Sequence, residues 1–200
     1  MVLLDLFCGA GGCATGYAQA GFEIIGIDVH PKRFPFEFHQ MDWRDGLEEF
    51  GGRADVIHAS PPCQAYSRSL GHFTSGYPEL VPDVREALTG TGKPYIIENV
   101  IGAPLKNPIM LCGTMFGLDV RRHRLFETSF PAEVPMKCNH DGLSVNPYRA
   151  STRQKLRETG ITNITRAFLE AMEVPWMRER EGREAIPPKY TRYLGGLVPA

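Results

Sequence analysis

The chain has 200 residues, of which 42% are hydrophobic and 22% are charged, and its formal net charge is −1. This length suits one domain with a sizeable core, and the near-zero balance does not by itself indicate a nucleic-acid-binding protein. No apolar run approaches the roughly 20 residues of a membrane-spanning helix, and no basic segment precedes the first apolar run, so neither a membrane protein nor a secretory signal peptide is expected.

The charges are divided unevenly along the chain. Residues 1–120 hold 8 basic and 14 acidic side chains, a balance of −6, whereas residues 121–200 hold 14 and 9, a balance of +5. Such a division is common among surface charges. It is also what a protein would show if its C-terminal part faced phosphates and its N-terminal part did not.

The cysteines are odd in number and scattered, and no two of them form a C-x-x-C pair; they are Cys8, Cys13, Cys63, Cys112 and Cys138. This arrangement predicts free thiols and a cytoplasmic location rather than a disulfide framework. Cys138 and His140 lie two residues apart, as some metal ligands do. Two further ligands are missing at any usual spacing, so no metal site is predicted.

The first 130 residues alternate between short apolar runs and helical stretches. Strands are predicted over Val2–Phe7, Phe22–Asp28, Ala54–Ser60, Pro94–Val100 and Arg121–Thr128. One helix is predicted over Cys13–Ala20, with Gly21 at its end, and another after a capping-box pattern of Asp83 and Glu86, ending near Gly90. The alternation predicts βαβ units and a mostly parallel sheet.

After Phe130 the pattern changes. Residues 131–150 are irregular and polar and contain three prolines. Ser151–Gln154 is a pattern that could cap the start of a short helix, and an amphipathic helix is predicted over Asn163–Glu173. The tail Pro187–Val198 has large apolar side chains at helical spacing, which predicts docking onto a core; they are Tyr190, Tyr193, Leu194 and Leu197.

The turn after the first strand is rich in glycine. Asp5-Leu-Phe-Cys-Gly-Ala-Gly-Gly12 would lead from a strand into a helix, where bare backbone and free N–H groups can contact a ligand. The spacing differs from the G-x-G-x-x-G of dinucleotide binders, and a tight turn without a ligand stays open. Asp28 ends the next strand, where an acid can bind ribose hydroxyls, and Asp42 could hold an adenine amino group. Taken alone, each acid is more often a solvated surface residue.

A second motif, Ser60-Pro-Pro-Cys-Gln-Ala-Tyr-Ser67, follows the third predicted strand. Ligands bind at the carboxyl ends of strands in open α/β sheets, and a thiolate held there by two prolines could serve as a nucleophile. A buried, inert Cys63 is the alternative. The stretch Ala65–Tyr77 is rich in serine and glycine, which is typical of a loop that closes over a substrate.

Two further motifs carry charged groups at strand positions. Glu98-Asn99-Val100 closes a predicted strand. A carboxyl group buried there is costly unless it has a charged or hydrogen-bonding partner or a functional role. In Arg121-Arg-His-Arg-Leu-Phe126, alternation along a strand would put Arg122 and Arg124 on one face, suited to a phosphate, a base or a carboxylate. The alternatives are a structural ion pair for Glu98 and a solvated basic strand for the arginines.

Taken in this order, Asp5–Gly12, Pro62-Cys63-Gln64, Glu98-Asn99-Val100 and Arg122-x-Arg124 resemble the DNA cytosine-5 methyltransferases over roughly residues 1–130. The resemblance implies a Rossmann-like α/β fold with a mostly parallel sheet flanked by helices, S-adenosylmethionine as cofactor, and cytosine in duplex DNA as substrate. The shortness of the chain indicates a small bacteriophage-encoded member of this restriction-modification family, acting in the bacterial cytoplasm.

The resemblance also implies residue roles. Cys63 would attack C6 of cytosine, Glu98 would contact N3 and the exocyclic amino group, and Asn99 would orient the loop that carries Cys63. Arg122 and Arg124 would support the geometry of Glu98 and the base. The cofactor would be held by Asp5, Phe7, Gly9, Ala10, Gly11, Gly12, Asp28, Val29, Asp42 and Pro62, and the substrate would also contact Gln64, Ser67 and Arg68.

Three features depart from the family pattern. Val120 stands where the family usually has glutamine, and Ala185-Ile186-Pro187-Pro188 replaces a closing Gly-Asn before Val-Pro. Only residues 131–175, between a core at 1–130 and a C-terminal segment at 176–200, could form a target-recognition region. Its basic residues would grip phosphates; they are Arg149, Arg153, Lys155 and Arg157.

These departures leave the substrate and the oligomeric state open. The same chemistry on RNA or on a free cytosine nucleotide is one alternative, because a small recognition region suits a substrate read by shape. A non-catalytic module that binds cofactor or DNA is another, although it would need neither Cys63 nor Glu98 nor Arg124.

Overall fold

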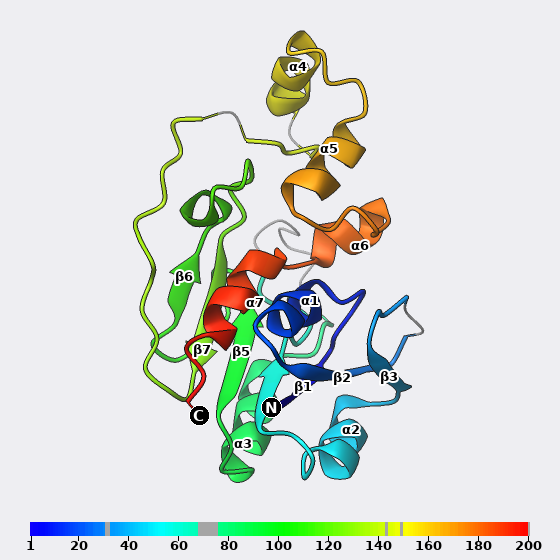
Figure 1. Ribbon diagram of the computed structural model, residues 1–200, viewed down its shortest axis with the longest axis vertical. Helices are drawn as coiled ribbons and strands as arrows, with labels where there is room; N and C mark the ends of the chain where they lie inside the picture. Colours follow the sequence, from blue (N-terminus) through cyan, green and yellow to red (C-terminus); the bar gives the residue numbers. More distant parts are fainter. Residues whose placement is uncertain (31–32, 68–75, 143, 149, 200) are drawn as a thin grey trace.

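The computed structural model describes residues 1–30, 33–67, 76–142, 144–148 and 150–199. Within these residues one seven-stranded sheet has the order β3-β2-β1-β4-β5-β7-β6, with helices on both faces (Figure 1). The strands are β1 (Val2–Leu6), β2 (Glu23–Asp28), β3 (Glu37–Gln40), β4 (Val56–Ala59), β5 (Tyr95–Asn99), β6 (Ile109–Leu111) and β7 (Arg124–Thr128). The helices are α1 (Gly12–Gln19), α2 (Trp43–Phe50), α3 (Val81–Gly90), α4 (Ala150–Glu158), α5 (Ile164–Ala171), α6 (Glu179–Glu184) and α7 (Pro188–Gly195), with a 3-10 turn η2 (Gly113–Phe116).

The direction of the strands makes this a Rossmann-like α/β sheet. Strands β3, β2, β1, β4 and β5 run parallel, and β7 is antiparallel to both β5 and β6. The chain moves outward from β1 in one direction through β2 and β3, and then returns to the other side of β1 through β4 and β5. Open α/β sheets bind ligands at such a reversal, at the carboxyl ends of the strands. The predicted fold class is confirmed.

Side chains alternate between two cores on opposite faces of the sheet. One core, under α1 and α7, takes Leu3, Val56 and Ile96; the other, under α2 and α3, takes Leu4, Ile57 and Ile97. All of these side chains are fully buried. The continuous apolar strands of the sequence are explained by this burial on both faces.

The C-terminal helix α7 docks on α1, as the spacing of its apolar residues predicted (Figure 1). Gly16 of α1 lies directly against the backbone of α7, where a Cβ atom would collide with the Pro188 carbonyl oxygen and the Thr191 hydroxyl. The Thr191 hydroxyl donates to the Cys13 carbonyl oxygen at 2.8 Å. The chain end is therefore fixed beside the helix that follows the glycine-rich turn.

Several element predictions differ from the structure. Asp83 and Glu86 lie inside α3, which begins at Val81 after the N-cap Leu80, so the capping-box prediction was wrong; the helix does end at Gly90. Ser151 likewise lies inside α4. The sequence pattern also missed β3, α2, β6 and α6.

No helix in the described ranges is both long and apolar enough to cross a bilayer.

Candidate active site

The sheet brings three of the predicted motifs to one edge. Strand β4 continues into Ser60 and the Cys63 loop, and the neighbouring strand β5 ends with Glu98 and Asn99. Because β7 runs antiparallel to β5, its first residues pair with the last residues of β5, as in the register of Asn99 with Leu125. Arg124, at the start of β7, therefore lies beside the acid that ends β5.

Glu98 and Arg124 form a buried ion pair, with 3.1 Å between Arg124 Nε and Glu98 Oε1. Glu98 is 6% exposed. Burial raises the pKa of the Glu98 carboxyl group above its ordinary value, although the Arg124 and Arg122 charges and a hydrogen bond with Ser60 oppose that shift. A carboxyl group in this setting keeps its proton to a higher pH than a surface glutamate does, which suits a proton donor.

Cys63 is half-buried and its thiol is free. Its loop is fixed by Asn99, whose Nδ2 donates to the Pro61 carbonyl oxygen at 2.9 Å, and by a turn in which the Tyr66 N–H donates to the Cys63 carbonyl oxygen at 3.0 Å. Burial raises the pKa of the Cys63 thiol, and the Arg124 charge lowers it. Gln64 Oε1 is buried without a hydrogen-bond partner among the described residues, so it is free to accept from a ligand.

Arg122 does not share a strand face with Arg124, because β7 begins only at Arg124; that prediction was wrong. Instead, Arg122 reaches the C-terminal segment, where its Nε donates to the Ala185 carbonyl oxygen at 2.7 Å and its guanidinium also contacts the Arg183 carbonyl oxygen. Burial and the neighbouring Arg124 charge lower the pKa of Arg122. The contacts of Arg122 therefore join the arginine motif before β7 to the chain at the end of α6 and the start of the link to α7.

The glycine-rich turn has an unusual backbone. Phe7, Gly9 and Gly11 all have positive φ values, of 61°, 52° and 84°. A left-handed conformation is uncommon for a bulky residue such as Phe7 and is often found at functional sites. The carboxylate of Asp28 fixes the turn to β2, since the Gly9 N–H donates to its Oδ2 at 3.0 Å and the His30 N–H to its Oδ1 at 2.9 Å.

Asp5 is fully buried on β1, and neither of its carboxylate oxygens has a hydrogen-bond partner within the described residues. Burial raises its pKa well above the ordinary value, and the charges of Asp28 and Glu98 raise it further. A buried carboxylate without a partner is costly unless a ligand supplies one. A cationic ligand at the glycine-rich turn would fit this position.

The remaining predicted cofactor residues have varied surroundings. Asp42 is the N-cap of α2, where its Oδ1 accepts from the Arg44 N–H at 2.9 Å, and Val29 is exposed. The Ala10 carbonyl oxygen accepts from the Trp176 indole at 3.3 Å. Gly12 packs against the tail, because a Cβ atom there would lie 2.6 Å from the Ile186 carbonyl oxygen.

Three predicted residues lie at the loop after β4. Pro62 and Ser67 are half-buried. Arg68 lies outside the described residues, as does most of the stretch predicted to close over a substrate.

A buried polar chain that the sequence analysis missed leads to Glu98. Tyr17 Oη lies 2.9 Å from His58 Nδ1, and His58 Nε2 lies 2.9 Å from Ser60 Oγ. Ser60 in turn hydrogen-bonds Glu98. Burial lowers the pKa of His58 to about 3, so the imidazole is neutral. The sequence feature that could have revealed this polar chain is the alternation of side chains along β4. It places His58 on the same face of the sheet as Asp5.

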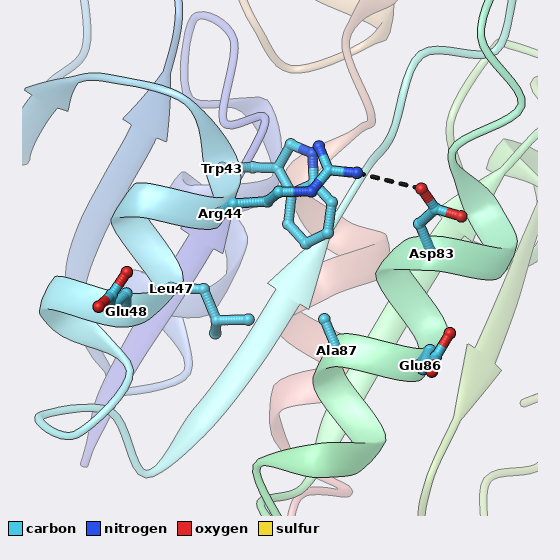
Figure 2. Close-up of a pocket in the computed structure, with 7 residues that line it drawn as sticks. All are labelled: Trp43, Arg44, Leu47, Glu48, Asp83, Glu86 and Ala87. Carbon is cyan, nitrogen blue, oxygen red and sulfur yellow. Dashed lines mark hydrogen bonds and ion pairs between the residues drawn. The ribbon is translucent and has the colours of Figure 1, made fainter.

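A pocket of about 530 Å³ lies apart from Cys63 and Glu98, between α2 and α3 (Figure 2). It is lined by Trp43, Arg44, Leu47, Glu48, Asp83, Glu86 and Ala87. Arg44 lies over the Trp43 ring, 4.4 Å from its centroid, and pairs with Asp83 at 3.0 Å across the pocket. Trp43 also lies 5.9 Å from Phe7, centroid to centroid, so it connects this pocket with the glycine-rich turn.

Comparison with protein families matches residues 1–104 to the C-5 cytosine-specific DNA methylases. The matched range includes the glycine-rich turn, Cys63 and Glu98, and it ends before Arg122 and Arg124.

Curated relatives match over similar ranges. The chain is 28% identical over 127 residues to the Type II methyltransferase M.AgeI of Thalassovita gelatinovora, which covers 51% of this chain and 28% of that protein. It is 36% identical over 77 residues to M.FnuDI of Fusobacterium nucleatum, covering 34% and 22%, and 32% identical over 79 residues to M.HgiGI of Herpetosiphon aurantiacus, covering 34% and 63%. The chain thus spans less than two thirds of the length of these curated relatives.

Solved structures share the fold. The S. pombe Dnmt2 methyltransferase aligns with a TM-score of 0.60 and 13% identity over 98% of this chain and 97% of that chain. The Spodoptera frugiperda DNMT2 variant E260A/E261A/K263A aligns with a TM-score of 0.54 and 12% identity over 96% and 98%. At such low identity these structures support the Rossmann-like methyltransferase fold alone. The family match covers more than half of the chain, and this chain therefore belongs to the C-5 cytosine-specific DNA methylase family.

Proposed function

We propose that this chain transfers a methyl group from S-adenosylmethionine to C5 of cytosine in DNA through a covalent bond between Cys63 and C6. The observation that carries the proposal is the meeting of Cys63, Glu98 and Arg124 at one edge of the sheet, with a 3.1 Å ion pair between the last two. A module that only binds cofactor or DNA would have no use for a buried carboxyl group beside a free thiol. Family membership and the names of the Type II relatives support DNA as the substrate and a restriction-modification role.

The glycine-rich turn is the proposed cofactor site. The unpartnered Asp5 carboxylate fits a cationic group, and S-adenosylmethionine carries both an ammonium and a sulfonium. A Cβ atom at Gly9 would meet no atom of the described residues, beyond its chain neighbours, within 4 Å, which leaves room for a ligand beside the backbone there. Asp28, Val29 and Asp42, together with Ala10 to Gly12 and Pro62, complete the proposed cofactor set. The Trp43 ring beside Phe7 is a further aromatic surface for a purine.

The residues at the sheet edge would act in sequence. When bound, S-adenosylmethionine supplies an electrophilic methyl group on its sulfonium. The Cys63 thiolate adds to C6 of the ring, and Glu98 donates a proton at N3, so that no negative charge builds up on the base. C5 thereby becomes the nucleophilic carbon of an enamine and takes the methyl group, and the electron pair of the broken C–S bond stays on the sulfur of S-adenosylhomocysteine. A base then removes the C5 proton, N3 returns its proton to Glu98, and the thiolate leaves C6 with restoration of the aromatic ring.

Arg124 would hold the Glu98 carboxyl group in place and favour the Cys63 thiolate, whose pKa its charge lowers. Asn99 would orient the loop through its bond to Pro61. Arg122 would act at a distance, by fixing the tail against the motif. Gln64, with its unpartnered oxygen, and Ser67 and Arg68 are the proposed contacts to the substrate.

Cytosine C6 is hidden in a duplex, so the base must leave the stack, at a cost of a few kcal/mol. Residues 131–175, beside the core at 1–130 and the C-terminal segment at 176–200, are the proposed recognition region. Arg153, Lys155 and Arg157 are exposed there on α4. Helix α4 lies at the far end of the molecule from α2 and α3, where it could contact a backbone beyond the reacting base (Figure 1).

The experiment that tests the proposal is incubation of the chain with methyl-labelled S-adenosylmethionine and, separately, duplex DNA, transfer RNA and dCMP, followed by nucleoside analysis. The expected result is 5-methylcytosine in DNA, absent with Cys63→Ser. If label appeared only in RNA or only in dCMP, the proposed C5 methylation would stand, but DNA would be replaced as the substrate. Label at another cytosine atom would refute the mechanism.

A further inference from the structure

Four potential metal ligands meet near the end of β6 and the start of β7: Cys112, His123, Cys138 and His140. One ligand atom from each lies within 4.8 Å of all the others. We propose that these four side chains bind a zinc ion that fixes the irregular segment 131–142 to the core. In the sequence, Cys138 and His140 lie two residues apart, and no further ligands stand at a usual spacing from them.

The geometry suits two thiolates and two imidazoles around one ion. Cys112 Sγ lies 3.4 Å from His140 Nε2, and Cys138 Sγ lies 3.9 Å from His123 Nε2. Tetrahedral zinc, with Zn–S of about 2.3 Å and Zn–N of about 2.0–2.1 Å, separates such atoms by about 3.5 Å. Each imidazole thus presents a nitrogen to a sulfur at nearly the separation that a shared ion requires.

The donor set also indicates the kind of site. Two cysteines with two histidines form a closed tetrahedral set, typical of structural zinc, whereas catalytic zinc keeps one position for water. Cys112 is fully buried, and the other three ligands are half-buried. The proposed ion is therefore structural, and it takes no part in methyl transfer.

The ligands come from the ends of two paired strands of the sheet and from a segment without regular structure. Cys112 follows β6 and His123 precedes β7, whereas Cys138 and His140 belong to a segment without helix or strand. The large apolar side chains Val134 and Met136 of that segment are exposed. A segment that buries so little apolar surface gains stability from a metal that ties it to buried residues.

The site would also position the catalytic motif. His123 lies between Arg122, which binds the tail, and Arg124, which pairs with Glu98. A metal bond at His123 fixes the backbone from which both guanidiniums extend. The guanidinium of Arg121 donates to the Gly142 carbonyl oxygen at 2.7 Å and also contacts the His140 carbonyl oxygen, which joins the same two segments a second time.

The ligands are separated by ten, fourteen and one residues in chain order, which matches no usual zinc pattern. Only the antiparallel return of β7 beside β6 brings Cys112 and His123 together, as the register of Leu111 with Arg124 shows. The sequence spacing therefore could not reveal the site.

The test is the metal content of the full chain, purified without a histidine tag and measured by inductively coupled plasma mass spectrometry. We expect about one zinc per chain in the wild type, and loss of that zinc in Cys138→Ser and in His140→Gln. Cys63→Ser and His30→Gln are matched controls that remove one thiol and one imidazole elsewhere and should keep the zinc. Replacement by Co²⁺ should give the absorption spectrum of tetrahedral cobalt with sulfur ligands.

A second measurement uses only the wild type. Removal of metal by a chelator should lower the melting temperature, and Zn²⁺, but not Mg²⁺, should restore it. The proposal is overturned if the wild type binds no zinc after reconstitution, if Cys138→Ser and His140→Gln keep the wild-type zinc content, or if a non-reducing peptide map finds a Cys112–Cys138 disulfide in its place.

Discussion

The Glu98 carboxylate at the end of β5 and the Arg124 guanidinium at the start of β7 form an ion pair of 3.1 Å at the edge of the sheet where Cys63 lies. Three residues further along β7, Glu127 forms a different pair with Arg85 of α3, at 2.7 Å. Both acids are buried, and they differ in what surrounds them. Glu127 accepts three hydrogen bonds, from Arg85 Nε, from Arg85 Nη2 and from the Lys106 backbone N–H. Both of its carboxylate oxygens therefore have hydrogen-bond partners within the protein.

We predict opposite effects of the same substitution at these two sites. Glu98→Gln should lower the methylation rate by about 10²–10⁴, because it removes a proton donor. It should change the free energy of unfolding less than Glu127→Gln does, because Glu98 Oε1 has no hydrogen-bond partner among the described residues. Glu127→Gln should instead lower that free energy by about 3–5 kcal/mol, because it breaks a buried pair, and leave the rate of the folded fraction near normal. Single-turnover kinetics and urea denaturation of both variants would check this. A near-normal rate for Glu98→Gln would reassign Glu98 to structure.

Substitution of glycine in the cofactor turn should weaken cofactor binding. Gly9 and Gly21 both have positive φ, and a Cβ atom at either would lie more than 4 Å from every atom beyond the glycine and its chain neighbours in the part of the chain that the structure describes. Alanine at each should therefore cost stability through backbone strain alone, about 1–2 kcal/mol. Only Gly9→Ala should also weaken binding of S-adenosylhomocysteine in a calorimetric titration. Equal affinity in the two variants would count against this turn as the cofactor site.

Asp5 gives a prediction about pH. Its folded pKa is raised above the unfolded value, so the folded protein binds the proton more tightly. The stability gained from protonated Asp5 is fully present below the unfolded pKa, and it is lost as pH rises through the folded pKa. Asp5→Asn should remove this loss and stabilise the cofactor-free protein at neutral pH by about 1–3 kcal/mol.

The same Asp5→Asn variant should bind S-adenosylmethionine more weakly, because a neutral amide cannot pair with a cation. Denaturation of wild type and variant at a series of pH values, starting near the ordinary pKa of an aspartate and rising from there, would give both stability curves. Parallel curves, or unchanged affinity for the cofactor, would be inconsistent with an unpartnered Asp5 that awaits a cationic ligand.

The exposed basic residues of α4 should contribute affinity without sequence information. Arg153 and Arg157 lie one helical turn apart. Changing both to glutamine should make the dependence of log K on log salt shallower by about 2, since each phosphate contact contributes about 0.9. Arg44→Gln with Arg53→Gln makes the same change in net charge near α2 and should leave the slope unchanged. Filter-binding or fluorescence titration at several salt concentrations would measure both, and equal slopes would remove α4 from the DNA interface.

Much of the sheet could be predicted from the sequence because its central strands are short apolar runs that end in glycine, proline or polar residues. Strand β1 with the Gly9–Gly12 turn, and β4 with the Pro61–Cys63 loop, are such cases. Strand β3 (Glu37–Gln40) was missed because it lies at the sheet edge and has no buried residue. Asp42 was considered as an adenine ligand or as a solvated surface residue, and its role as the N-cap of α2 was not foreseen.

The parts of the site that depend on tertiary contacts could not be predicted. Arg122 precedes β7 and binds carbonyl oxygens about 60 residues later in the chain, a contact that no local pattern contains. The tail Ala185–Pro188 departs from the family motif, yet it packs on Gly12 at the start of α1. The cluster of Cys112, His123, Cys138 and His140 depends on the return of β7 beside β6.

The central claim is that Cys63 forms a covalent bond with the cytosine that is methylated, and its most direct measurement is trapping on DNA that contains 5-fluorocytosine. Fluorine at C5 cannot leave as a proton does, so the thiolate stays bonded to C6 after methyl transfer. With S-adenosylmethionine present, the wild type should give a stable protein–DNA adduct, and mass spectrometry should find the nucleotide on the peptide that contains Cys63. Cys63→Ser should give no adduct and no turnover while it still binds S-adenosylhomocysteine. An adduct on another residue, or substantial methylation by Cys63→Ser, would contradict the account.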